Sequence, residues 1–344
     1  MKPQTKRALV VGPYRTHNFG DDLVGAILTR HLQMHGYEVV VPKLGEENCE
    51  WLGIKHEPSY QGMFESSDVV VLGGGGIMSD TSGAKPGASY LEIITRAGMS
   101  GALRGKTLYA TSIGAGPLHL DKSKMLAFGV SLLAEKIGVR EAESYEHLLK
   151  LGVGKGKLQL GADLALLTPQ LLDFPQGNSR KLGIQFDVTN FPSVQNNPNL
   201  AEIIRTLEAY AASNQNDVML LKNGKARPGL SGAAPDAERL VYSTLEDYLP
   251  KLSGLRSIFT SHLHLAITSF SQRIPTFSLY VREKTRRFYE QINRPERAVD
   301  LETATVDDLK RLIHLAQEAE WSEQDELALQ SLKAKSREIL DFVR

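Results

Sequence analysis

The sequence contains a single cysteine, Cys49, among its 344 residues. One cysteine excludes an internal disulfide framework, and no second thiol exists to build a cysteine-rich metal site. Such scarcity is typical of proteins from reducing compartments, so we expect a cytoplasmic location.

Net charge and long apolar runs are also lacking. Forty Lys and Arg balance forty Asp and Glu, so no whole-chain field attracts nucleic acid or an anionic membrane. No window approaches the roughly 20 apolar residues of a membrane-spanning helix. The basic N-terminus runs into the apolar stretch 8–11 without a signal-peptide cleavage pattern. We therefore expect no transmembrane segment and no nucleic-acid partner.

Short apolar runs rich in Val, Ile and Leu alternate instead with longer amphipathic stretches. This alternation is typical of a buried parallel sheet covered by helices on both faces. The expected strands are residues 8–12, 38–41, 68–73, 106–112, 136–139, 158–160, 182–186, 218–221, 257–260 and 276–280. The expected helices include residues 21–35, 200–212, 264–271 and 322–343. The pattern predicts an α/β fold of two doubly wound, Rossmann-like domains.

The length of the chain likewise favours two domains, since a typical domain has roughly 150 residues. The polar stretch 173–180 indicates a linker. We predict an N-terminal domain over residues 1–172, a C-terminal domain over 178–317, and a terminal helix over 318–344 that bridges them. Residues 223–236 contain three Gly and two Pro and predict a mobile loop.

Three strand ends in the first half are rich in glycine. They are residues 12–22, Gly73 to Gly76, and residues 111–118. Ligands of open α/β sheets bind outside the carboxyl ends of strands, where helix N-termini present free N–H groups. None of the three has the spacing of a P-loop or a dinucleotide fingerprint. Together they predict backbone donors for a carboxylate or a phosphate.

Each glycine-rich loop also has a plainly structural interpretation. The first is equally compatible with an ordinary helix start capped by Asp21 or Asp22. Tight packing of a helix on the sheet explains one or two of the four consecutive glycines, but hardly all four.

Polar residues follow two strands of the second half, at residues 260–264 and 280–284. We expect both strand ends to face an interdomain cleft. His262 and His264 are two residues apart and cannot share a helical face, so one of them is expected to point into the cleft. No carboxylate or cysteine lies at a ligand spacing from these histidines, so we expect no metal and no cofactor.

The basic residues near these strand ends have two interpretations. Arg140 either binds an anionic ligand or forms a surface ion pair with Glu141 or Glu143. Lys284, Arg286 and Arg287 are equally typical of a solvated helix face, and for the two arginines this interpretation is preferred.

A series of short motifs follows in a fixed order along most of the chain. They are Asn18-Phe-Gly-Asp21, the strand at Asp68 with Gly73 to Gly76, Ile113-Gly-Ala-Gly-Pro117, Val139-Arg140-x-x-x-Ser144, Gly161-Ala-Asp163, Ser261-x-Leu-His264 and Tyr280-x-x-x-Lys284. The series resembles the polysaccharide pyruvyl transferase family. The resemblance implies a fold similar to GT-B glycosyltransferases. It also implies transfer of a pyruvyl group from phosphoenolpyruvate to a sugar diol, as a ketal on an exopolysaccharide precursor.

The resemblance further implies a role for each candidate residue. His264 would be the catalytic acid or base, and Asn18 and Asp21 would bind the acceptor saccharide. The donor phosphoenolpyruvate would be bound by Arg140, Lys284, His262, Gly74, Gly75, Gly114 and Gly116.

One position departs from the family pattern, because His262 stands where family members usually carry arginine. Losing a charge-assisted bond of about 1.5 to 3 kcal/mol predicts donor binding weaker by roughly tenfold to a hundredfold, unless Arg282 or Arg286 compensates. Two other functions therefore stay open: a GT-B-like glycosyltransferase that uses a nucleotide sugar, and a non-catalytic relative.

Overall fold

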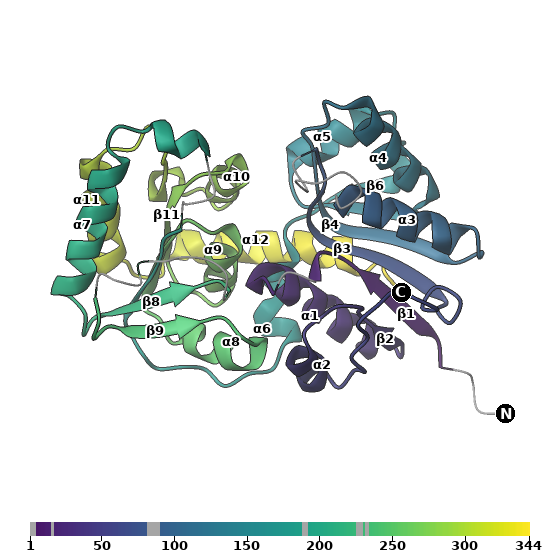
Figure 1. The fold of residues 1–344 in the computed structure, drawn as a ribbon, viewed down its shortest axis with the longest axis horizontal. Coiled ribbons are helices and arrows are strands. Elements are labelled where there is room, and N and C mark those ends of the chain that lie inside the picture. The colour runs from purple at the N-terminus through teal and green to yellow at the C-terminus, as the bar shows by residue number, and fades with distance from the viewer. Residues whose placement is uncertain (1–4, 15–16, 81–89, 188–191, 225–229, 231–233) are drawn as a thin grey trace. The chain divides into compact units, whose positions relative to one another are not determined.

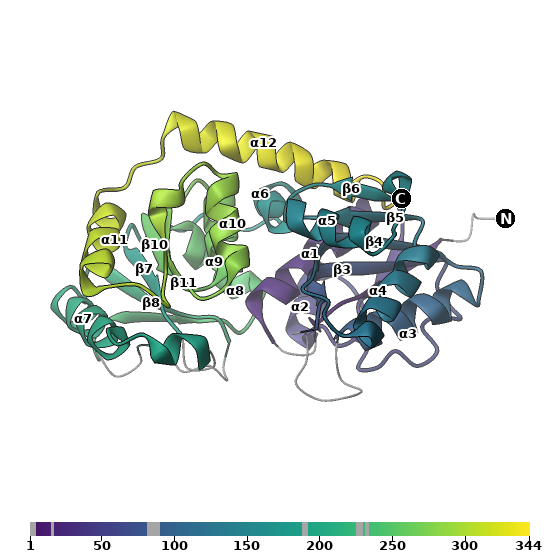
Figure 2. The ribbon, with the colours of Figure 1, turned by 90° about the horizontal axis from the view of Figure 1, so that it is seen from above.

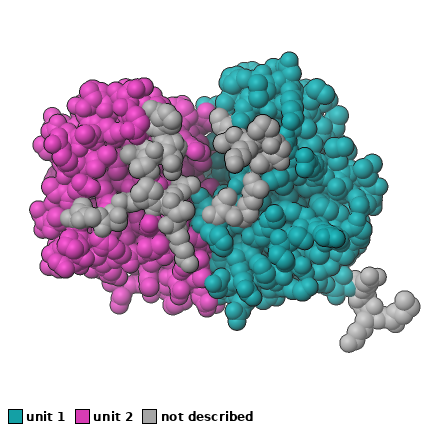
Figure 3. Space-filling model, viewed as in Figure 1, with its two compact units in different colours: residues 1–172, 332–344 teal, residues 173–331 magenta. Residues whose placement is uncertain are grey.

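A computed structural model describes residues 5–14, 17–80, 90–187, 192–224, 230 and 234–344. The chain divides into two compact units, one of residues 1–172 and 332–344 and the other of residues 173–331 (Figure 3). Most of the loop expected at residues 223–236 lies outside the described residues. Within the described part of the chain, no helix is long and apolar enough to cross a membrane.

Unit 1 is built on a parallel sheet of six strands in the order β2-β1-β3-β4-β5-β6. Its elements are β1 (Arg7–Val11), α1 (Phe19–Met34), β2 (Glu38–Val40), α2 (Glu46–Leu52), β3 (Val69–Met78), α3 (Tyr90–Ala102), β4 (Thr107–Ala115), α4 (Asp121–Leu133), β5 (Lys136–Val139), α5 (Ala142–Lys150), β6 (Leu158–Leu160) and α6 (Thr168–Leu171). The chain leaves β1 toward β2 and then crosses to β3 on the other side of β1. Helices α1 and α2 pack on each other on one face of the sheet, and α3 to α5 lie on the other face (Figure 1).

Unit 2 repeats this plan with the strand order β12-β11-β10-β7-β8-β9. Its elements are β7 (Leu182–Gln185), α7 (Leu200–Ser213), β8 (Val218–Lys222), β9 (Glu238–Val241), α8 (Leu245–Ser253), β10 (Ser257–Thr260), α9 (Leu263–Ser271), β11 (Thr276–Tyr280), α10 (Glu283–Gln291), β12 (Ala298–Asp300) and α11 (Val306–Glu318). Helices α7 and α11 pack on each other, and their apolar residues share one core with β7, β8 and β11. The prediction of two doubly wound, Rossmann-like sheets is confirmed.

The expected strands lie within a few residues of the observed ones, and β5, β6, β10 and β11 have the expected limits. Two strands were missed, β9 and β12. Both are edge strands of unit 2. Edge strands are short and only partly buried, so they lack the continuous apolar run that identifies a central strand. Strand β3 also continues through the glycines at which it was expected to end.

The last helix, α12 (Glu323–Leu340), has residues in both units (Figure 2). Its first turn is a capping box: the Ser322 hydroxyl accepts from the Asp325 N–H at 3.2 Å, and the Asp325 carboxylate accepts from the Ser322 N–H at 3.2 Å. The helix expected over residues 322–343 thus begins at the expected position. Asp325 also pairs with Arg294 and Arg297, at 2.8 and 3.0 Å, within unit 2.

The other end of α12 is anchored in unit 1. The Thr111 hydroxyl donates to the Ile339 carbonyl at 2.5 Å, and the Ser336 hydroxyl donates to the Asp163 carbonyl at 2.9 Å. Gly138 and Gly161 lie under Ile339, where an added Cβ would come within 2.6 Å and 2.5 Å of its side chain. These glycines let the helix approach the sheet edge closely.

Buried His31 of α1 connects that helix to the C-terminus, because its Nε2 lies 3.0 Å from the Val343 carbonyl. Burial lowers the pKa of His31 from 6.5 to about 4. Between pH 6.5 and pH 4 the histidine is protonated in the unfolded chain but not in the native state. The free energy of unfolding therefore has its full value above pH 6.5 and decreases toward pH 4. We expect unit 1 to lose about 2 kcal/mol between pH 7 and pH 5, measured by urea unfolding. His31→Gln should remove this step, and an unchanged pH slope in that variant would contradict the assignment.

Candidate functional site

In unit 1 the candidate residues gather at the carboxyl ends of β1, β3, β4 and β5. The end of β1 leads into α1, and Asn18 is its N-cap, with Oδ1 accepting from the Gly20 N–H at 3.0 Å. The cap is thus Asn18, and the expectation that Asp21 or Asp22 caps this helix was wrong. Asp21 and Asp22 lie in the first turn instead, where negative charge complements the helix dipole.

The glycine run of β3 has two different causes along its length. An added Cβ on Gly73 would lie 2.2 Å from Leu28 of α1, and one on Gly74 would lie 2.4 Å from Val24. Gly74 also has a φ of +69°, a conformation that L side chains rarely adopt. Helix packing therefore accounts for the first two glycines.

Gly75 and Gly76 have no such packing requirement. Gly75 has a φ of +83°, and its added Cβ would lie 3.7 Å from Asp21 Oδ1 in ordinary contact. Gly76 is exposed, and a Cβ there would meet nothing within 4 Å. The pairing of β3 with β4 is irregular between Gly75 and Met78, as at many strand ends beside binding sites. These two glycines form the bare backbone that remains available to a ligand.

The end of β4 brings Arg140 beside this backbone. An added Cβ on Gly114 would lie 3.2 Å from Arg140 Nη2 and 3.2 Å from the Gly76 Cα. Gly116 has a φ of +90°, and a Cβ there would lie 2.1 Å from Nδ1 of His147. A side chain at Gly114 would crowd the Arg140 guanidinium, and one at Gly116 would crowd the His147 ring.

Arg140 is not on the surface, so the expected surface ion pair was wrong. Its side chain is 4% exposed, and Nη1 pairs with Asp163 Oδ2 at 2.8 Å. Asp163 also caps a short 3-10 helix by accepting from the Ala165 N–H at 3.0 Å. Burial disfavours the charged guanidinium, but Asp163 and Glu141 outweigh it and raise the pKa of Arg140.

The charge of this strand-end cluster is negative on balance. Asp163, Glu141 and Asp21 all act electrostatically on Arg140. Ser144, whose hydroxyl donates to Glu141 at 2.9 Å and accepts from the Ala115 N–H at 2.8 Å, connects the cluster to the β4 loop. A ligand that binds at this strand end therefore meets these three carboxylates as well as the Arg140 guanidinium.

In unit 2 the corresponding edge carries a connected polar network at the end of β10. Buried Gln185, the last residue of the neighbouring strand β7, accepts with Oε1 from the Thr260 hydroxyl at 2.7 Å and from the Ser261 N–H at 3.1 Å. The Ser278 hydroxyl of β11 donates to the Thr260 carbonyl at 2.6 Å. This network holds the turn from β10 into α9, on which both candidate histidines lie.

The two histidines occupy different positions in that turn. His262 is the N-cap of α9, and His264 is the second residue of the helix, half-buried. Nδ2 of buried Asn223, which follows β8, lies 2.8 Å from His262 Nδ1. This hydrogen bond orients the His262 imidazole. An arginine in its place would offer a permanently charged group able to make two parallel hydrogen bonds.

The cations after β11 have unequal surroundings. Lys284 is half-buried in the first turn of α10. This helix follows β11, which pairs with β10, the strand that ends at Thr260. Exposed Arg286 pairs with Glu283 at 2.7 Å and also with Glu290, along one face of the same helix. The solvated-face interpretation is therefore correct for Arg286, and this arginine does not replace the missing family arginine. Gln185 and Asn223 were missed because single amides after apolar strands carry no distinctive spacing.

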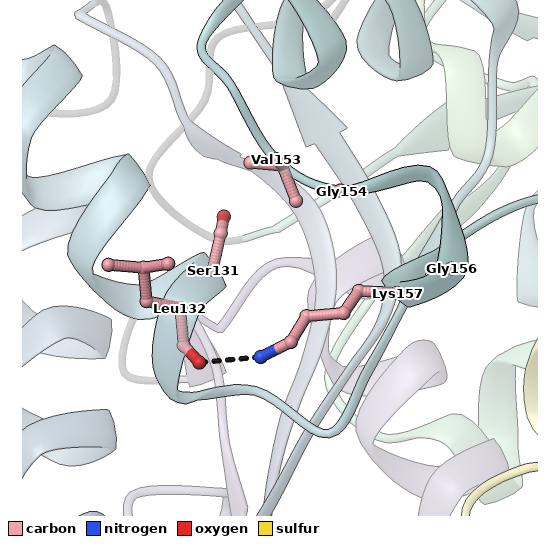
Figure 4. Close-up of a pocket in the computed structure, with 6 residues that line it drawn as sticks. All are labelled: Ser131, Leu132, Val153, Gly154, Gly156 and Lys157. Atoms are coloured by element: carbon pink, nitrogen blue, oxygen red, sulfur yellow. Dashed lines mark hydrogen bonds between the residues drawn. The ribbon is translucent and has the colours of Figure 1, made fainter.

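Unit 1 also holds a small cavity away from these residues (Figure 4). It has a volume of about 250 Å³ and lies between the end of α4 and the segment before β6. Lys157 crosses it, and its Nζ donates to the Leu132 carbonyl at 2.6 Å. The amine thus joins α4 to that segment.

Among the described residues, no group of three or more His, Cys, Asp or Glu is arranged to hold a metal ion.

Two Rossmann-like units in one chain, with polar residues at the carboxyl ends of their strands, define a protein of the GT-B class. The sequence model for polysaccharide pyruvyl transferases matches residues 18–283. The chain therefore belongs to the polysaccharide pyruvyl transferase family, as its motifs predicted, and this family is one of transferases. The match begins at Asn18 and ends one residue before Lys284.

Solved structures agree on the fold. The UDP-GlcNAc 2-epimerase from Neisseria meningitidis bound to UDP-GlcNAc is 12% identical, with a TM-score of 0.60 and coverage of 98% of each chain. The UDP-GlcNAc 2-epimerase from Methanocaldococcus jannaschii, in complex with UDP-GlcNAc and UDP, is 11% identical, with a TM-score of 0.57 over 98% of this chain and 99% of its own. The spinosyn forosaminyltransferase is 12% identical, with a TM-score of 0.54 over 96% of each chain. A search of curated protein sequences finds no match.

Proposed function

We propose that this protein transfers a pyruvyl group from phosphoenolpyruvate to two hydroxyls of a sugar, forming a ketal on an exopolysaccharide precursor in the cytoplasm. The observation that carries the proposal is His264, half-buried in the first turn of α9, on a turn held by Gln185 and Thr260. A histidine supplies or takes a proton near neutral pH, which this chemistry requires.

The reaction needs one proton donor and one base. Protonation of the methylene carbon of phosphoenolpyruvate makes the adjacent carbon electrophilic, and a sugar hydroxyl attacks that carbon and loses its proton. The bond from this carbon to the phosphate oxygen breaks and phosphate leaves. The second hydroxyl then attacks the same carbon and closes the ketal, and its proton is taken up by the released phosphate. His264 is the proposed acid or base. Lys284, His262, Arg140 and the loops at Gly74, Gly75, Gly114 and Gly116 are assigned to the donor, and Asn18 and Asp21 to the acceptor.

Phosphoenolpyruvate is expected to raise the melting temperature, because a ligand at a hundred times its Kd stabilises the native state by about 2.7 kcal/mol. For a domain of this size that is a shift of roughly 5 to 10 °C. Differential scanning fluorimetry with phosphoenolpyruvate, UDP-GlcNAc and inorganic phosphate measures it, and NMR detects the ketal methyl group. A shift with UDP-GlcNAc alone would favour a glycosyltransferase, the second candidate, which the GT-B likeness to the forosaminyltransferase supports. An unchanged melting temperature with all three ligands would favour the third candidate, a non-catalytic relative.

His262→Arg tests the departure from the family pattern. Placing a permanent charge where the imidazole now stands should tighten phosphoenolpyruvate binding by roughly tenfold to a hundredfold, measured by isothermal titration. His314→Arg, an exposed histidine on α11, is the matched control and should change nothing. If the two variants bind phosphoenolpyruvate with equal affinity, His262 has no role in donor binding.

A further inference from the structure

A second, larger cavity opens at the carboxyl end of β1 in unit 1. Its volume is about 330 Å³, within the range of small-molecule sites. The residues that line it include Gly12, Lys43, Tyr60, Phe64, Tyr90 and Arg96. It thus combines three aromatic rings with two cationic side chains, and none of these residues has a role in the proposed chemistry.

Helix α3 builds one wall of the cavity. Leu91 and Ile94 are buried in the core of unit 1, and an added Cβ on Gly101 would lie 3.0 Å from Val70 of β3. Tyr90, Ile93, Ala97 and Ser100 follow at helical spacing and line the cavity. Ala97 also belongs to the core, and Tyr90 and Ile93 pack against it, so the cavity lies at the edge of this core.

The two cations at the cavity are not neutralised. Among the described residues, neither Lys43 nor Arg96 forms an ion pair, whereas Arg140, Arg286 and Arg294 are all paired with carboxylates. Lys43 Nζ lies 5.8 Å from the centre of the Tyr60 ring, in the range of a cation–π contact. Lys43 also has a φ of +70°, which a residue with a side chain adopts at a cost and which is common at binding sites.

We propose that this cavity binds an anionic saccharide, as the sugar unit of the acceptor that carries a carboxylate or a phosphate. The inference rests on the proposed function. Aromatic rings pack against the C–H faces of a sugar ring, and Lys43 and Arg96 supply charge-assisted hydrogen bonds to its anionic group. Phosphoenolpyruvate has no ring to cover three aromatic side chains. The cavity also borders Gly12, on the segment that leads to the proposed acceptor residues Asn18 and Asp21.

Isothermal titration without phosphoenolpyruvate tests the inference with three sugars of similar shape, glucuronate, glucose 1-phosphate and glucose, and separately with UDP. At least one anionic probe should bind roughly tenfold or more tightly than glucose. The stronger of the two identifies the group as a carboxylate or a phosphate. Equal binding of all three, or preference for UDP over both anionic sugars, would overturn the proposal.

Arg96→Gln should reduce binding of the preferred anionic probe by roughly tenfold and leave glucose binding unchanged. Arg96 is exposed, so this variant is expected to fold, and Arg205→Gln, on an exposed position of α7 in unit 2, is the matched control. Unchanged affinity in Arg96→Gln would overturn the assignment. The titration is repeated with His264→Ala. If the unaltered protein binds the anionic saccharide but forms no ketal, the proposed chemistry is contradicted and this inference is not. If ketals form only on neutral sugars, this inference is contradicted and the proposed chemistry is not.

Discussion

Replacing His264 with alanine is expected to lower the rate of ketal formation by at least about a hundredfold, since a positioned acid or base contributes roughly 10² to 10⁴. The side chain lies in the first turn of α9, after a strand end held by Gln185, Thr260 and Ser261. The rate is measured as phosphate released from phosphoenolpyruvate and as the ketal methyl signal in NMR.

The control for this loss is His314→Ala, on an exposed position of α11 in the same unit. It should retain full activity. His264→Ala should still be stabilised by phosphoenolpyruvate, because a proton-transfer residue acts on the reaction rate more than on ground-state binding. Full activity of His264→Ala would refute the catalytic assignment, and loss of the ligand-induced stabilisation would make His264 a binding residue instead.

Replacing Arg140 with methionine is expected to destabilise unit 1 by about 3 to 5 kcal/mol, because it leaves the Asp163 carboxylate buried without its cation. Both side chains of the pair are almost fully buried, at 4% and 6% exposure. The free energy of unfolding is measured by urea denaturation, with the transition of unit 1 followed separately. Arg286→Met, which removes an exposed arginine from helical pairs on α10, is the control and should cost less than about 1 kcal/mol.

The double variant Arg140→Met, Asp163→Leu separates stability from binding. Removing both charges should recover part of the lost stability, since the Asp163 carboxylate is no longer left without its cation. Recovery is incomplete because buried Glu141 remains and the cap at the Ala165 N–H is lost. If Arg140 binds the donor, phosphoenolpyruvate affinity stays low in the double variant. Recovery of both properties would show that Arg140 only stabilises the β4 and β5 strand ends, and a single variant as stable as the unaltered protein would refute the buried pair.

Most of the fold could be predicted from the sequence because buried parallel strands consist of continuous apolar runs. Val69-Val-Val-Leu72 could hardly be anything other than a central strand, and it pairs with β1 and β4 on its two sides. The edge strands β9 and β12 escaped notice because charged residues occupy part of each, Glu238 and Arg239 in β9 and Asp300 in β12, so neither is a continuous apolar run.

The candidate site was anticipated less completely. Strand ends and their glycines were found, since open α/β sheets concentrate them at one edge. The sequence predicted that helix packing explains one or two of the four glycines, but not which ones. Leu28 and Val24 of α1 lie against Gly73 and Gly74. Which side chain presses on which backbone depends on the helix placement over the sheet.

The glycine-rich strand ends were thus determined by the sequence alone, together with the two doubly wound sheets, the family and the order of its motifs. The sheets follow from local periodicity, and the family follows from the ordered series of motifs. Only the tertiary structure decided that Arg140 is buried against Asp163, that Asn223 is hydrogen-bonded to His262, and that Lys43 and Arg96 line one aromatic cavity. Each of these contacts joins residues more than 20 positions apart, and packing rather than sequence spacing brings them together.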